Sequence, residues 1–178
     1  MDSLRLINKY YANQPELKRI VLIHSQCVAA KALELAKKHP ELNMDLNFIR
    51  DAALIHDIGV FKTKAEDILC FGSEPYLAHG YLGADIIRNE GYPKHALVCE
   101  RHTGTGISLE EILSKNLPLP PRDMRPVSLE EQLICFADKF YSKTHLNTEK
   151  SVDEARNSLA RFGENVVIQF DKWCELFL

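Results

Sequence analysis

A long amphipathic pattern near the N-terminus constrains the fold of this chain more than any other feature. Its apolar side recurs at spacings of three and four residues, which is the period of an α-helix. The positions are Leu17, Ile20, Val21, His24, Val28, Ala32 and Leu35. Asn13 can cap this helix, Pro15 suits its first turn, and Pro40 ends it beside His39. A helix with one apolar face must bury that face, so the pattern predicts helices packed on helices.

Helical patterns also dominate the rest of the chain. They predict helices over about residues 45–58, 79–89, 94–102, 128–144 and 152–177. A shorter helix is expected after Ser108, because Ser108-Leu-Glu-Glu111 is a capping-box pattern. Residues 60–78 and the proline-rich stretch 117–127 are predicted to be loops. Since no segment alternates apolar and polar residues over a convincing length, the predicted fold class is all-α.

Length and composition fit one globular domain. The 178 residues are 46% hydrophobic and 26% charged, which is an ordinary balance for a soluble protein. We therefore expect one domain over 1–178, with its core over about 17–145 and the last helix, 152–177, packed on it. The apolar stripe of that last helix also leaves homodimerisation open. The formal net charge of −3 favours neither a nucleic-acid polymer nor an anionic membrane as a partner.

The cysteines and the N-terminal residues indicate the compartment. Five cysteines are widely spaced without a Cys-X-X-Cys pair, so we interpret them as reduced thiols. Residues 1–6 carry no signal-peptide pattern, and no apolar run approaches the roughly 20 residues that span a bilayer. These observations lead us to expect a cytoplasmic protein.

The dipeptide His56-Asp57 carries the strongest chemical signal. It lies at the end of an apolar, helix-forming run, Asp51-Ala-Ala-Leu-Ile-His-Asp-Ile-Gly59. Burying an imidazole next to a carboxylate is unfavourable unless another group pairs with them. A divalent cation satisfies both groups at once, because it binds neutral imidazole nitrogens and carboxylate oxygens.

Four further side chains of the same kind fall on apolar faces or at helix ends: His24, His79, His102 and Asp138. Each histidine alone has a structural explanation, as a core residue or a helix-terminal one. Asp138 is harder to explain, because its neighbours are apolar and Lys139 points to another face of the helix. Packed helices can bring such side chains to one centre. Nitrogen and oxygen ligands without thiolate favour Fe, Mn, Ni, Co or Mg over a closed structural zinc site.

The order His24, His56-Asp57, Asp138 resembles the HD-domain superfamily of metal-dependent phosphohydrolases. The string His-Asp-Ile-Gly is the form that its HDIG branch carries, and the similarity covers roughly residues 17–145. This resemblance implies a compact HD-domain helical bundle. It also implies a small phosphorylated substrate, namely a nucleotide, a dinucleoside polyphosphate or another small phosphate ester.

The other two histidines look like those of binuclear members of this superfamily. These members include the HD-GYP phosphodiesterases and the YqeK-type diadenosine tetraphosphate hydrolases. The chain is more similar to the YqeK type in its length, in the His-Thr-Gly sequence at 102–104 and in the Ala-Asp-Lys sequence at 137–139. Gly-Tyr-Pro at 91–93 lies upstream of His102 and is not the HD-GYP signature.

Residue by residue, the resemblance implies two metal ions and a metal-activated water. The first metal would be held by His24, His56, Asp57 and Asp138, and the second by His79 and His102, with Asp57 as the bridge. Asp57 would also orient the water. Beside Asp57 we select Lys62 and Lys139 as catalytic candidates, although Val60 and Phe61 separate Lys62 from the His-Asp pair. The candidates for substrate binding are Lys62, Arg101, Arg122 and Lys143.

Three alternatives remain open from the sequence. In a mononuclear nucleotidase, His79 and His102 would only position phosphate, and one metal per chain is expected. A catalytically silent regulatory module would bind metal or nucleotide without turnover. A purely structural helical domain with dispersed histidines would bind no metal.

Overall fold

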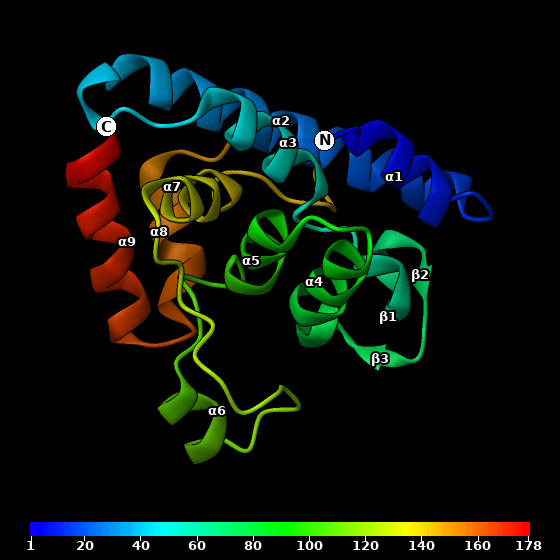
Figure 1. Ribbon diagram of the computed structural model, residues 1–178. Coiled ribbons are helices and arrows are strands. Elements are labelled where there is room, and N and C mark those ends of the chain that lie inside the picture. Colours follow the sequence, from blue (N-terminus) through cyan, green and yellow to red (C-terminus); the bar gives the residue numbers. More distant parts are fainter.

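Helices make up most of the structure, a computed structural model that describes residues 1–178 (Figure 1). The α-helices are α1 (Ser3–Tyr10), α2 (Pro15–Lys38), α3 (Leu46–Ile55), α4 (His79–Asn89), α5 (Pro93–Arg101), α6 (Leu109–Ser114), α7 (Leu129–Asp138), α8 (Val152–Ala160) and α9 (Glu164–Phe177). The predicted all-α class is therefore confirmed. None of these helices is both long enough and apolar enough to cross a membrane.

The loop predicted over residues 60–78 contains a small sheet that the sequence did not predict. Its strands are β1 (Thr63–Ala65), β2 (Cys70–Phe71) and β3 (Glu74–Pro75), in the order β2-β1-β3. β1 pairs antiparallel with β2 and parallel with β3. Strands of two or three residues are too short to show an alternating pattern. The sheet lies beside α4, on the side of the molecule away from α9 (Figure 1).

Two apolar clusters form the core, and α2 contributes to both. One cluster joins the second half of α2 to α3, α7, α8 and α9. The other joins the first half of α2 to α1, α4, α5 and the end of α3. Val21 belongs to the second cluster and Val28 to the first, so His24 lies between them on α2. Polar side chains at this boundary are buried on both sides by apolar residues.

Helix α7 ends at Asp138, not near residue 144 as the sequence pattern suggested. The backbone hydrogen bonds there change to the three-residue type. The N–H groups of Lys139, Phe140 and Tyr141 each donate to the carbonyl three residues earlier. Such bonds satisfy the last carbonyls of a helix and end it. The residues that follow leave the helix axis, which allows Lys143 to turn back toward the buried end of α7.

The C-terminal segment forms two helices where we predicted one over 152–177. Gly163 separates α8 from α9 and adopts a φ of 120°, a conformation that side-chain-bearing residues rarely take. The break lets α9 pack across α7. The rings of Phe170, Trp173 and Phe177 are buried against Phe136, at centroid distances of 5.2, 6.4 and 5.7 Å.

Candidate metal centre

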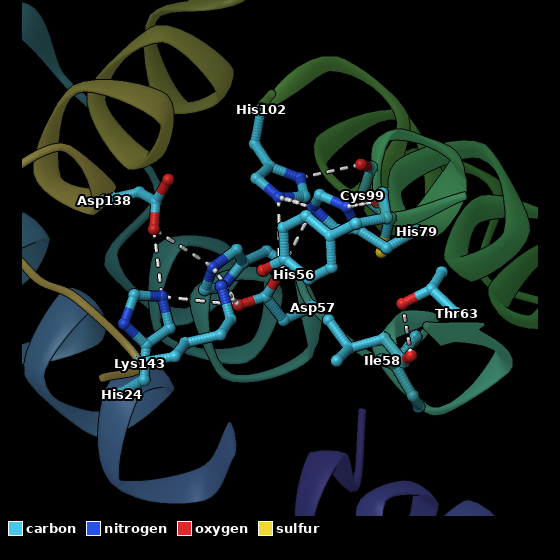
Figure 2. A network of polar contacts seen from close by, with 12 residues as sticks. His24, His56, Asp57, Ile58, Thr63, His79, Cys99, His102, Asp138 and Lys143 are labelled. Atoms are coloured by element: carbon cyan, nitrogen blue, oxygen red, sulfur yellow. Dashed lines mark hydrogen bonds and ion pairs between the residues drawn. The ribbon is translucent and has the colours of Figure 1, made fainter. Parts of the chain in front are cut away.

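The six side chains predicted as metal ligands lie together at the boundary between the two apolar clusters (Figure 2). They come from five places in the chain: His24 in α2, His56-Asp57 directly after α3, His79 at the start of α4, His102 directly after α5, and Asp138 at the end of α7. Four of the five places are helix ends. The side chain of Asp138 is 13% exposed, and the other five are 5% exposed or less.

One group of ligand atoms surrounds Oδ2 of Asp57. Nε2 of His24 lies 3.3 Å and Nε2 of His56 lies 3.1 Å from this oxygen. The same two nitrogens lie 2.9 Å and 3.5 Å from Oδ1 of Asp138. Single atoms of His24, His56 and Asp138 all lie within 4.8 Å of one another, which is compatible with binding one ion.

A second group surrounds the other oxygen of the same carboxylate. Nε2 of His79 and Nε2 of His102 each lie 3.5 Å from Oδ1 of Asp57, and they lie 3.0 Å from each other. The two oxygens of Asp57 therefore face different sets of imidazoles. A carboxylate placed in this way can bridge two cations.

Backbone carbonyls fix the tautomer of three of the four histidines. Nδ1 of His56, His79 and His102 lies 2.6, 2.6 and 2.7 Å from the carbonyl oxygen three residues earlier. A carbonyl only accepts, so Nδ1 carries the proton and donates it. In the neutral imidazole, Nε2 then has a free lone pair aimed at the centre, which is the usual arrangement for a metal-ligating histidine; the second proton that the carboxylates favour on His56 would be displaced by a metal ion.

The buried carboxylates are ionised and hold a proton on a neighbouring imidazole. Burial opposes the charge of Asp57, but the positive charges of His56 and Lys143 hold the pKa of Asp57 well below its usual range. The same balance, with Lys139 as the main cation, holds the pKa of Asp138 well below its usual range. Burial also disfavours charged His56, but the two carboxylates outweigh it and raise the pKa of His56 to about 9.

The pKa values of His79 and His102 are lowered, in contrast to that of His56. Burial and the charge of His102 lower the pKa of His79 to about 3. Burial also lowers the pKa of His102. Both imidazoles are therefore neutral near pH 7, which is the form that binds a metal ion.

The donor atoms fit a divalent cation. Nε2 of His56 and both oxygens of Asp57 are buried and have no well-directed hydrogen-bond partner. Buried polar atoms are rarely left in this state. The ammonium of Lys143 lies 2.6 Å from Oδ2 of Asp57, close enough for an ion pair, and so places a positive charge at the centre. Nitrogen and oxygen donors that converge in this way, without a thiolate, suit Fe, Mn, Ni, Co or Mg.

The centre opens into a cavity of about 960 Å³. His24, His79, Asp138, Lys139 and Lys143 form its inner wall. The outer wall comes from residues 64–68, from 103–107 and from the segment 158–166 at the junction of α8 and α9. A small molecule can therefore reach the ligand groups from one side.

The predicted cations fall into two sets. Lys143 and Lys139 line the cavity. The ammonium of Lys139 is held between Oδ2 of Asp138, at 2.6 Å, and the carbonyl of His102, at 3.0 Å. The exposed Lys62 does not line the cavity.

Arg101 and Arg122 are engaged elsewhere. Arg101 donates to Glu131 at 2.8 Å, which ties α5 to α7. Arg122 donates to the buried Glu100, which ties the proline-rich loop to α5. Neither arginine lines the cavity, so the structure does not bring these two predicted substrate-binding residues to the centre. Lys150 and Arg161 do line the cavity, and no sequence motif marked them.

A model of the HD domain family matches residues 21–143, a span that contains all six ligand positions. An uncharacterized protein of Methanocaldococcus jannaschii is 37% identical over 121 residues, which cover 66% of this chain and 64% of that protein. No solved structure matches significantly.

Two archaeal proteins named tRNA (cytidine(56)-2'-O)-methyltransferase are also similar. The protein from Thermoplasma volcanium is 32% identical over 155 residues, or 86% of this chain and 40% of that protein. The protein from Picrophilus torridus is 29% identical over 140 residues, or 78% of this chain and 36% of that protein. The match thus spans less than two thirds of the length of each of these three relatives.

Proposed function

Because the chain belongs to the HD domain family, we propose that it is a metal-dependent phosphohydrolase. Its substrate would be a nucleotide, a dinucleoside polyphosphate or another small phosphate ester, attacked by an activated water. The observation that carries this proposal is the buried carboxylate of Asp57, whose two oxygens face separate groups of imidazoles. The methyl transfer in the names of two relatives is not extended to this chain, since most of the length of those proteins lies outside the match.

Two cations would each be held by one group of ligands. His24, His56 and Asp138, with Oδ2 of Asp57, would hold one. His79 and His102, with Oδ1 of Asp57, would hold the other. When bound there, divalent cations would lower the pKa of a water molecule and offset the charge that develops on the phosphoryl oxygens.

Protein groups around the centre would orient the reactants. Asp57 lies between the two groups of imidazoles and can accept a hydrogen bond from the water. Lys143 lies in the cavity wall next to Asp57 and can hold a phosphate oxygen by a charge-assisted bond. Lys139 is already bound to Asp138 and to the carbonyl of His102, so its role would be to position these two groups.

A hydrolysis assay tests this function. Purified protein supplied with Mn²⁺ or Fe²⁺ is incubated with phosphomonoesters, phosphodiesters, nucleotides and dinucleoside polyphosphates, and the products are separated by anion-exchange chromatography, since cleavage of a diester or a dinucleoside polyphosphate need not release orthophosphate. We expect hydrolysis of at least one substrate class, loss of hydrolysis on chelation, and loss of hydrolysis in Asp57→Ala. His145→Ala is the matched control, because His145 is exposed and outside the centre, and it should retain full activity. Metal binding without hydrolysis of any substrate would instead support a silent regulatory module.

A further inference from the structure

The cavity beside the metal centre carries more positive than negative charge, in a chain whose net charge is −3. Three carboxylates and six cations line it. The cations are Lys64, Lys115, Lys139, Lys143, Lys150 and Arg161. A local excess of cations in an acidic protein indicates that the cavity binds an anion.

Most of these cations already have a carboxylate partner. Lys64, Lys115, Lys139 and Lys143 each form an ion pair, at distances of 2.6 to 3.3 Å. Lys150 and Arg161 form none. These two cations are therefore free to bind an anionic ligand.

Hydrogen bonds place Lys150 next to the inner wall. The backbone N–H of Lys150 donates to the carbonyl of Phe140 at 2.8 Å, and its ammonium lies 3.5 Å from the carbonyl oxygen of Lys139. Lys139 in turn contacts Asp138. Lys139 thus lies between Lys150 and the predicted metal ligand Asp138, and Lys150 is not itself in the metal centre.

Lys150 and Arg161 repel each other across the cavity wall. Burial lowers the pKa of Lys150, and the charges of Lys139 and Arg161 lower it further, against the opposing effects of Asp138 and Glu154. Arg161 is held by the ring of Phe162, whose centroid lies 4.7 Å from the guanidinium carbon. Phe162 also lines the cavity and is 51% exposed. Both cations line the same cavity and neither is paired with a carboxylate, so a bound phosphate would offset their charges.

We propose that Lys150 and Arg161 form a second anion subsite, which binds a phosphate group of the substrate other than the one attacked. This inference rests on the proposed function and narrows it. The substrate class would be compounds with two or more phosphate groups, such as condensed phosphates and their esters. A simple phosphomonoester would occupy only the inner part of the cavity.

Binding of inorganic tripolyphosphate and of orthophosphate tests the subsite without turnover. Each is titrated by calorimetry into the full-length protein, as purified and after chelation, and the chelated protein gives the affinity without hydrolysis of tripolyphosphate. We expect Lys150→Met and Arg161→Gln each to weaken tripolyphosphate binding by about ten- to a hundredfold, which is the effect of losing one charge-assisted bond. Orthophosphate binding should stay within about twofold of wild type, because it engages mainly the inner wall.

Lys37→Met is the matched control, because Lys37 is an exposed lysine at the end of α2 and does not line the cavity. It should leave both affinities unchanged. Chelation of metal by tripolyphosphate is the same for every variant, so differences between variants report the subsite. Unchanged tripolyphosphate binding in both subsite variants, or equal loss of both ligands, would overturn the inference.

Turnover separates this inference from the proposed function. With 4-nitrophenyl phosphate as the substrate, Lys150→Met and Arg161→Gln should keep the wild-type KM and kcat. If the wild type hydrolyses phosphate esters but neither variant affects tripolyphosphate, the subsite is refuted and the function stands. If no ester is hydrolysed but tripolyphosphate binding depends on Lys150 and Arg161, the function is refuted and the subsite stands.

Discussion

The ammonium of Lys143 lies 2.6 Å from Oδ2 of Asp57, inside a centre that also holds four imidazoles. Burial disfavours the charge of Lys143, but Asp57 outweighs it and raises the pKa of Lys143. Lys143 thus offsets the negative charge of Asp57, which a bound divalent cation would also offset. This relationship predicts that the importance of Lys143 for stability depends on whether metal is bound.

Lys143→Met should destabilise the metal-free protein strongly, because it leaves the buried carboxylate of Asp57 with one cation fewer. Removing one partner of a buried pair costs about 3 kcal/mol. With metal bound, we expect the loss to be less than half of that value. Urea unfolding with EDTA and with Mn²⁺ measures both losses, and Lys143→Arg should largely preserve stability in both states. Equal destabilisation in the two states would show that Lys143 and metal do not share this role.

His102→Ala should remove the second metal while leaving the first. Nε2 of His102 lies 3.5 Å from Oδ1 of Asp57 and 3.0 Å from Nε2 of His79, whereas no ligand atom of His102 is grouped with His24 and Asp138. We expect the metal content of the purified protein to fall from two equivalents to one. His95→Ala is the matched control, because His95 lies on α5, the helix that precedes His102, and its ring packs against Phe48, outside the centre. Two metals retained in His102→Ala would exclude the binuclear assignment.

Gly59→Ala should destabilise the protein and disturb His79. A Cβ at Gly59 would lie 2.2 Å from the carbonyl oxygen of His79 and 2.4 Å from the backbone nitrogen of Gly83. Backbone atoms cannot rotate away, so α4 would have to shift. We expect a loss of about 3 kcal/mol in the free energy of unfolding, measured by chemical denaturation, together with weaker metal binding.

Gly91→Ala provides the comparison for this prediction. No atom lies within 4 Å of a Cβ at Gly91, so only its φ of 87° opposes the substitution. That conformational strain costs about 1 kcal/mol and should leave metal binding unchanged. If the two variants lost equal stability and bound metal equally well, the close approach of Gly59 to α4 would not position His79.

Glu100→Gln should weaken binding of the second metal through the position of α5. The buried carboxylate of Glu100 accepts from Arg88 and Arg122 at 2.8 Å and holds the end of the helix that precedes His102. Losing its charge should cost about 2 kcal/mol of stability. Competition with a chelating dye measures the metal affinity, and Glu110→Gln, an exposed glutamate on α6, is the control. Unchanged affinity would limit Glu100 to a purely structural role.

The sequence was most informative where a residue type conflicted with its surroundings. His24 within an apolar stripe, His56-Asp57 after an apolar run and Asp138 among apolar neighbours each require a partner, and the structure brings them together. Helix boundaries were predictable where proline or a capping residue marked them, as at Pro15. The end of α7 and the break at Gly163 were not predicted, because no proline marks either point and a single glycine within a helical pattern does not by itself identify a break.

Long-range charge pairing was not predictable from the sequence. Arg101 and Arg122 pair with Glu131 and Glu100, which lie 30 and 22 positions away without any helical spacing. A free cation and a paired one look alike in a sequence. For the same reason nothing in the local pattern marked Lys150 and Arg161 as cations that share one cavity.

Metal quantification on the purified, folded protein tests the central claim most directly. Wild type and Asp57→Ala are each incubated with Mn²⁺ or Fe²⁺, freed of unbound metal, and analysed by plasma mass spectrometry, with circular dichroism to verify folding. We predict two equivalents per chain in the wild type and none in Asp57→Ala. A folded wild type that retains no metal, or an Asp57→Ala variant that retains both equivalents, would contradict the account.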